Sequence, residues 1–195
     1  MMKPSARRFS LILLSVVIAG AGLAACAPLL VGGAVMTGMS AADRRTTGAQ
    51  IEDERIETRG AGRIRENIGD RVHINITSYN RQVLLTGEVP NEQDKQLAEQ
   101  VVSRIENVRA ITNELAVLGH STLTQRSSDA LVTGRVKANL IDAKDLSSSA
   151  FKIVTERGAV YLLGRVTARE ADRATDIARR TSGVQKVVRL FEIIT

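Results

Sequence analysis

The stretch VLLTGEV, residues 83–89, decides the fold because it returns as VYLLGRV at residues 160–166. The offset of 77 between the two stretches also carries Ile74 onto Phe151 and Ile76 onto Ile153. Self-similarity at one fixed offset is the signature of a repeated structural unit. The chain therefore contains two copies of a unit of about 65 to 70 residues.

The second copy shows the order of elements most clearly. Alternating apolar residues at 151–155 and 160–166 predict two strands, with a turn at Arg157-Gly158. The Thr167-x-x-Glu170 spacing is a capping box and predicts a helix that ends near Gly183, followed by a last strand over 184–194. Asn107 occupies the matching helix end in the first copy. A helical pattern over 129–142, with capping residues at 127–129, precedes the strands.

These elements predict an α+β fold with two tandem αββαβ domains. Each domain is expected to be a small three-stranded mixed sheet covered by two helices. Gly87 and Gly164 interrupt the strand pattern at equivalent places and predict a close backbone approach there. The expected boundaries are 50–118 for the first domain, 119–127 for a polar linker and 128–195 for the second domain.

The first 25 residues read as a secretory leader rather than as part of the fold. Three basic residues, Lys3, Arg7 and Arg8, precede an apolar stretch over 9–19. That stretch is shorter than the roughly 20 apolar residues that span a bilayer, although a retained anchor helix is the alternative. The following LAAC, residues 23–26, resembles the bacterial lipobox, which implies a Cys26 that carries diacylglyceryl and acyl groups and becomes the mature N-terminus.

Residues 26–49 are rich in Gly and Ala and are expected to form a tether near the bilayer surface. Arg44 and Arg45 would then be available to lipid phosphates. A buried first strand or helix in this segment is the alternative. Once the leader is removed, 24 basic and 21 acidic residues remain, so much of the apparent basicity of the chain belongs to the leader.

The residues present no catalytic or metal-binding motif. There is one Cys, which excludes a disulfide framework and a Cys-clustered zinc site. The two histidines, His73 and His120, are far apart in the sequence and are interpreted as ordinary polar or partly buried residues. We therefore expect no enzymatic activity, no metal and no cofactor other than the lipid groups on Cys26.

Charge distinguishes the two copies. Residues 26–120 hold 11 basic and 13 acidic side chains, whereas residues 121–195 hold 13 basic and 8 acidic ones. If either copy binds an anionic surface, the second should do so. Nucleic acid would be attracted as well, but export of the chain removes it from reach.

The helix over 129–142 has an unusual outward side. Val132, Val136 and Leu140 should face the sheet, yet the opposite side is mostly apolar, with Arg135 and Lys137 at its borders. Such a face is typical of a helix that lies in a bilayer interface. Packing of the same face against the first domain is the alternative. The residues expected to contact phospholipid are Ala130, Leu131, Gly134, Arg135, Lys137, Ala138, Ile141 and Asp142.

The lipobox, the repeated V-x-L-x-G-x-V strand and the αββαβ order together resemble the dual BON-domain lipoproteins of the bacterial outer membrane. The resemblance covers essentially the whole chain, including residues 43–50 and 182–187. It implies that the first helix of the second domain binds anionic phospholipid. Leu131 stands where some relatives carry a Trp, which implies weaker binding here or a larger share of it for Arg135 and Lys137. Ala27 after the lipobox implies sorting to the outer membrane, with the domains facing the periplasm.

The leading hypothesis is a non-enzymatic, monomeric outer-membrane lipoprotein that binds anionic phospholipid. The resemblance further implies a role in envelope integrity, with enrichment at division sites. The rival hypothesis is a protein-interaction module for envelope-assembly or peptidoglycan-associated partners, because a small sheet with a free edge can accept a partner strand. A periplasmic hydrolase would need a catalytic constellation that the residues do not show.

Overall fold

The structure, a computed structural model, describes residues 43–119 and 121–195, which belong to one compact unit, Gly38–Thr195. The predicted leader, Cys26, the tether up to residue 42 and His120 lie outside the described residues. No helix within the described residues is long and apolar enough to cross a bilayer. The first copy consists of helix α3 (Thr47–Ile68), strands β1 (His73–Tyr79) and β2 (Gln82–Val89), helix α4 (Glu92–Ser103), and strands β3 (Ala110–Asn113) and β4 (Ala116–Val117).

The second copy repeats this order. It consists of helix α5 (Leu123–Asp142), a short 3-10 turn (Ser148–Ala150), strands β5 (Phe151–Glu156) and β6 (Ala159–Val166), helix α6 (Ala168–Arg180) and strand β7 (Lys186–Ile193). The predicted α+β class and the αββαβ order are confirmed in both copies. The third strand of the first copy is divided into β3 and β4, whereas β7 is continuous.

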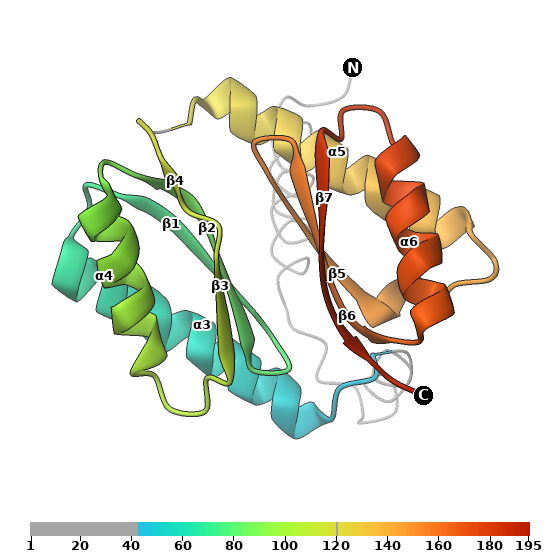
Figure 1. The fold of residues 1–195 in the computed structure, drawn as a ribbon, viewed down its shortest axis with the longest axis horizontal. Coiled ribbons are helices and arrows are strands. Elements are labelled where there is room, and N and C mark those ends of the chain that lie inside the picture. The colour runs from blue at the N-terminus through green and yellow to red at the C-terminus, as the bar shows by residue number, and fades with distance from the viewer. Residues whose placement is uncertain (1–42, 120) are drawn as a thin grey trace, which may run out of the picture. The chain divides into compact units, whose positions relative to one another are not determined.

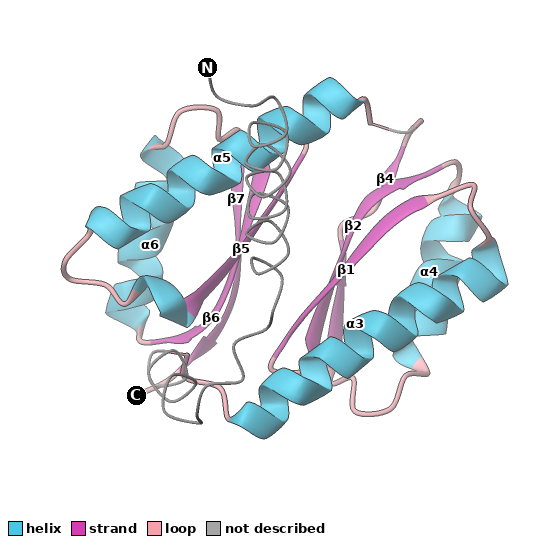
Figure 2. Ribbon diagram, turned by 180° about the vertical axis from the view of Figure 1, so that it is seen from behind, coloured by secondary structure: helices cyan, strands magenta, loops and turns pink. Residues whose placement is uncertain are grey.

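Each sheet is built around its second strand. β2 pairs antiparallel with β1 and parallel with β3 and β4, and β6 pairs antiparallel with β5 and parallel with β7. In each copy both helices cover the same face of the sheet (Figures 1 and 2). The predicted repeat is therefore a repeat of topology as well as of sequence.

The central strands β2 and β6 are buried on both faces. Val83, Leu85 and Val89 of β2 pack under helices α3 and α4, and the equivalent residues of β6 pack under α5 and α6. Leu84 of β2 and Tyr161 and Leu163 of β6 alternate with these residues and point the other way. Together with Tyr79, at the end of β1, they form a separate cluster that joins the two copies. Burial on both faces explains why these strands read as nearly continuous apolar runs.

The two hairpins share a turn geometry. Asn80 and Arg81 both have positive φ, at 49° and 66°, and Arg157 and Gly158 have φ of 53° and 74°. Two consecutive positive φ angles define a type I′ turn, which matches the twist of the adjoining strands. The predicted turn at Arg157-Gly158 is confirmed. Asn107 has a left-handed φ of 69°, as expected, but it does not end the helix: α4 ends at Ser103 with Arg104 as its C-cap, and Asn107 lies in the turn that follows.

The structure moves the start of the second copy's first helix. α5 begins at Leu123 after an N-cap at Thr122, so residues 123–127 of the predicted linker are helical. The predicted capping by residues 127–129 is wrong, because these residues lie inside the helix and the Asp129 side chain binds the β5–β6 turn instead. The two Asp129 oxygens accept hydrogen bonds from the backbone N–H groups of Arg157 and Gly158, at 2.8 and 2.9 Å. Likewise α3 begins at Thr47, inside the predicted tether.

The prediction that Arg44 and Arg45 face lipid phosphates is wrong, because carboxylates of the folded unit bind both side chains. The Arg44 guanidinium makes two 2.7 Å hydrogen bonds to Glu170, at the start of α6. Arg45 pairs with Asp43 and with the buried Asp53, both at 2.7 Å. Residues 43–46 are thus fixed to the folded unit by paired charges, and these arginines are not free to bind an anionic surface.

The Arg44–Glu170 pair should make stability depend on acidity. Hydrogen bonding to Arg44 lowers the pKa of Glu170 from 4.5 to about 2. Because the folded-state pKa is the lower one, the pair stabilises the fold fully above about pH 5 and loses its effect as the pH falls toward 2. We expect the free energy of unfolding to fall by about 2 kcal/mol from this pair between pH 6 and pH 3.

Urea unfolding at both pH values measures that change. Other carboxylates also titrate in this range, so the comparison is with Arg44→Gln, which leaves them in place. The variant should show a pH dependence smaller by about the contribution of the pair. Equal pH dependence in the two proteins would show that Arg44 does not set the pKa of Glu170.

Candidate functional site

The outward face of α5 is the site that the sequence predicted, and it is free of contact with the first copy. The helix turns Val132, Val136 and Leu140 into the core. All eight residues expected to contact phospholipid are exposed. Leu131 keeps 63% of its surface exposed and Ile141 keeps 58%. The alternative in which the first domain covers this face is therefore wrong: the copies instead meet through the cluster that includes Leu84 and Leu163.

The longer helix adds a residue that the sequence prediction missed. Leu123 lies five helical turns before Ile141, so the two point in the same direction from the helix axis. Its side chain is 79% exposed. The outward face therefore carries three large apolar side chains, Leu123, Leu131 and Ile141, spread over about 27 Å of helix. The apolar Leu123 is visible in the sequence, but it falls within residues 119–127, for which the sequence predicts a linker.

Cations border this face. Within the described ranges, neither Arg135 nor Lys137 forms an ion pair. Arg135 donates a 3.4 Å hydrogen bond to the carbonyl of Ser182. Asp142 is the acidic residue of the face and lies at the end of the helix. The positive charges at its borders are thus not neutralised within the described part of the chain.

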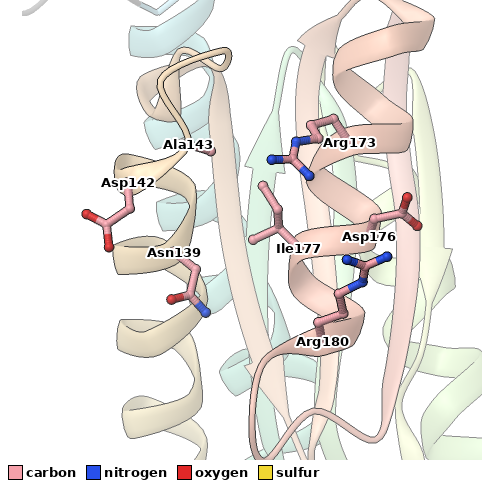
Figure 3. Close-up of a pocket in the computed structure, with 7 residues that line it drawn as sticks. All are labelled: Asn139, Asp142, Ala143, Arg173, Asp176, Ile177 and Arg180. Carbon is pink, nitrogen blue, oxygen red and sulfur yellow. The ribbon is translucent and has the colours of Figure 1, made fainter.

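A pocket of about 320 Å³ adjoins the C-terminal end of this face, between α5 and α6. Figure 3 shows Arg173 pointing toward α5, while Asp142 points away from α6. Arg173 also pairs with Asp145 at 3.3 Å. The residues that line the pocket are Asn139, Asp142, Ala143, Arg173, Asp176, Ile177 and Arg180. Two arginines and two aspartates balance in charge, so the pocket alone does not select an anion.

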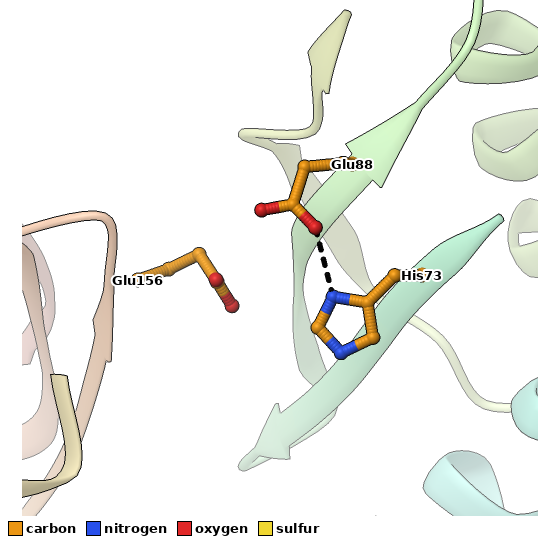
Figure 4. A group of neighbouring side chains, drawn as sticks. All are labelled: His73, Glu88 and Glu156. Atoms are coloured by element: carbon orange, nitrogen blue, oxygen red, sulfur yellow. Dashed lines mark hydrogen bonds and ion pairs between the residues drawn. The ribbon is translucent and has the colours of Figure 1, made fainter. Parts of the chain in front are cut away.

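A second cluster of chemical interest joins His73, Glu88 and Glu156 (Figure 4). His73 and Glu88 are cross-strand partners on β1 and β2, and the His73 Nδ1 lies 3.0 Å from Glu88 Oε2. Burial and the Glu88 carboxylate raise the pKa of Glu156. Burial by itself would raise the pKa of Glu88 too. Hydrogen bonds from Ser121 and His73 outweigh burial, and the pKa of Glu88 is therefore lowered. Among the described residues, this is the group that can hold a metal ion.

The sequence alone predicts that His73 is an ordinary polar or partly buried residue and that no metal binds. The hairpin register contains the signal for two of the three residues, because a two-residue turn at 80–81 places His73 opposite Glu88. Glu156 comes from the other copy. No pattern in the sequence shows which part of one copy meets the other.

Comparison with known proteins identifies relatives along most of the chain. Residues 52–119 and 128–195 each match the BON domain. The outer membrane lipoprotein DolP of Haemophilus influenzae is 35% identical over 174 residues, which make up 88% of this chain and 90% of that protein. The 21 kDa hemolysin of Actinobacillus pleuropneumoniae is 30% identical over 154 residues, 78% of this chain and 79% of that protein. The osmotically-inducible protein Y of Escherichia coli is 27% identical over 117 residues, 58% of each chain.

Proposed function

Because this chain belongs to the BON-domain family, with two such domains and a DolP-like layout, we propose that it binds anionic phospholipids through the outward face of α5. In this proposal it is a non-enzymatic outer-membrane lipoprotein, attached through acyl groups on Cys26, with both domains in the periplasm. Phosphatidylglycerol and cardiolipin are the anionic lipids that such a surface would meet. Its role would be to support envelope integrity, with enrichment at division sites.

The observation that carries this proposal is the exposure of Leu131 and Ile141 between Arg135 and Lys137, two cations that form no ion pair with any described residue. An exposed helix face normally presents charged residues to water. Here the apolar side chains stay in solvent, outside the buried core that other apolar residues of the same domain form. A bilayer interface accepts both parts of such a surface, because the apolar residues enter the acyl boundary while Arg135 and Lys137 stay among the phosphates.

The expected energies support reversible binding that depends on the lipid anchor. Burial of a leucine or isoleucine contributes about 1.5–3 kcal/mol, and each cation near an anionic leaflet contributes about 1 kcal/mol. Such binding is weak for a free domain. Acyl groups on Cys26 would make it effectively intramolecular, because they hold the domains at high local concentration beside the bilayer.

Vesicle flotation tests the proposal directly. A soluble form of residues 38–195, the compact unit, would be mixed with vesicles of phosphatidylcholine alone or with added phosphatidylglycerol. We expect binding to the anionic vesicles only, and a loss of about tenfold or more on Leu131→Glu, because the substitution removes apolar burial and adds a repelled charge.

The matched control is Ile51→Glu. Ile51 is an exposed apolar residue, 46% accessible, on α3, the equivalent helix of the first copy. Its neighbours Glu52 and Glu54 make that helix unsuited to an anionic surface, so the control should bind as the parent does. Equal binding to both kinds of vesicle, or no loss with Leu131→Glu, would contradict the proposal.

The rival function, a module that recruits envelope-assembly or peptidoglycan-associated proteins, is favoured by one observation. Strand β7 pairs with β6 on one side only within the described residues, and its Ile193 is 54% exposed. An unpaired strand edge can accept a strand from a partner. Photo-crosslinking from position 141 in cells separates the two functions, since the lipid proposal expects lipid adducts and the rival expects one specific protein.

A further inference from the structure

We propose that His73, Glu88 and Glu156 form a binding site for a divalent transition-metal ion of the Zn²⁺ class, which ties the two BON domains together. One ligand atom from each residue lies within 4.8 Å of the others. His73 and Glu88 belong to β1 and β2 of the first domain, and Glu156 ends β5 of the second. A metal held by all three would therefore bridge the domains.

The buried carboxylate of Glu88 is independent evidence for a ligand at this position. Glu88 is 1% exposed, and its Oε1 has no hydrogen-bond partner among the described residues. A buried carboxylate oxygen without a hydrogen bond is costly and rare in folded proteins. Figure 4 shows Glu88 turning one oxygen to His73 and the other toward the side where Glu156 lies. The free oxygen is thus aimed into the cluster.

The charges of the cluster favour a divalent cation. Two carboxylates held this close repel each other, and Glu156 is 8% exposed, so water screens the repulsion poorly. A divalent ion would neutralise both. The Arg157 guanidinium lies nearby, with its Nη1 3.6 Å from Glu88 Oε1, beyond hydrogen-bond distance. Arg157 offsets part of the charge but does not satisfy the free oxygen.

The donor set selects the class of metal. One imidazole nitrogen with two carboxylate oxygens suits Zn²⁺, which accepts three protein ligands and a water in tetrahedral geometry. Ca²⁺ and Mg²⁺ prefer oxygen ligands only and higher coordination numbers, so the imidazole disfavours them. Neighbouring groups would hold the ligands in place, since Ser121 donates to Glu88 at 3.2 Å and Asn75 donates to Glu156 at 3.2 Å.

Isothermal titration of the full chain with Zn²⁺ tests the site. The chain would carry Cys26→Ser in every sample, so that this thiol does not bind zinc, and would be purified in a non-ionic detergent after treatment with a chelator. We expect one equivalent of Zn²⁺ to bind and to raise the unfolding temperature, and Ca²⁺ to do neither. Glu156→Gln should weaken zinc binding at least tenfold while keeping the hydrogen bond from Asn75.

Two further variants show whether zinc binds at this cluster or at surface carboxylates. Arg157→Asn removes the competing cation at a position where Asn tolerates the positive φ, so zinc should bind more tightly. Glu106→Gln removes an exposed carboxylate, whose side chain is 77% accessible, and should change nothing. Failure of the parent chain to bind zinc at 1:1 stoichiometry, or equal binding by the parent and Glu156→Gln with circular dichroism showing both folded, would overturn the proposal.

Discussion

Replacing Asp53 with alanine is expected to lower the free energy of unfolding by about 3–5 kcal/mol, the usual cost of removing one partner of a buried ion pair. Asp53 is 2% exposed, and both of its oxygens are occupied. It accepts the backbone N–H groups of Asn80 and Arg81 at 2.8 and 2.7 Å, and the Ser78 hydroxyl at 2.6 Å. The carboxylate thus clamps the β1–β2 turn to helix α3.

The loss has two physical parts. The first is that the turn's N–H groups and the Ser78 hydroxyl lose their acceptor in a place that water reaches poorly. The second is that Arg45 loses one of its two carboxylate partners while its guanidinium stays over the Tyr79 ring, 4.2 Å from the centroid. Arg81 also holds a left-handed conformation, with φ of 66°, that the clamp stabilises.

The second copy provides the control. Asp129→Ala removes the same clamp on the β5–β6 turn, but Asp129 accepts only two backbone N–H groups and forms no ion pair among the described residues. We expect a smaller loss, about 2 kcal/mol. Urea unfolding of both variants measures the difference. If Asp129→Ala cost as much as Asp53→Ala, neither the ion pair with Arg45 nor the hydrogen bond from Ser78 would contribute to stability.

These two aspartates show how far the sequence could predict the fold. The repeat, the strands and the turn at Arg157-Gly158 follow from apolar spacing and glycine placement, which act locally. The capping box at Thr167 and Glu170 is local too, and both of its hydrogen bonds are present. Asp129, by contrast, follows two serines and looks like a helix cap. Only the packed fold brings it to a turn 28 residues further along the chain.

For the candidate site, as for the fold, the sequence predicts the features that depend on local periodicity and not those that depend on contacts between distant segments. The outward face of α5 follows from helical periodicity, so Leu131 and Ile141 were placed correctly as exposed residues. Leu123 was missed with the helix start. The contact between the copies was not predicted, although Leu84 and Tyr161 are apolar at positions that alternate with the core side. Alternation shows that a second face is buried but not what buries it, and for the same reason Glu156 could not be assigned to His73 and Glu88.

Replacing Gly87 with alanine is expected to cost about 3–5 kcal/mol, because two independent obstacles act at one residue. Its φ of +116° is a conformation that side chains rarely adopt, and a Cβ there would lie 2.0 Å from the backbone oxygen of His73. That oxygen belongs to β1, which pairs with β2 in the register Ile74 to Gly87. A flexible side chain could move aside, but a strand backbone cannot do so without breaking its pairing.

Two other glycines isolate the cause when all three variants are compared by urea unfolding. Gly164 occupies the equivalent position in β6, where a Cβ would lie 2.6 Å from the Ala150 oxygen without a positive φ, so Gly164→Ala should cost less. Gly62 is exposed on α3 with nothing within 4 Å of a Cβ, and Gly62→Ala should stabilise the helix by about 1 kcal/mol. A Gly87→Ala protein as stable as the parent would show that β1 and β2 do not approach as closely as the structure places them, and the pairing of His73 with Glu88 beside that glycine would lose its support.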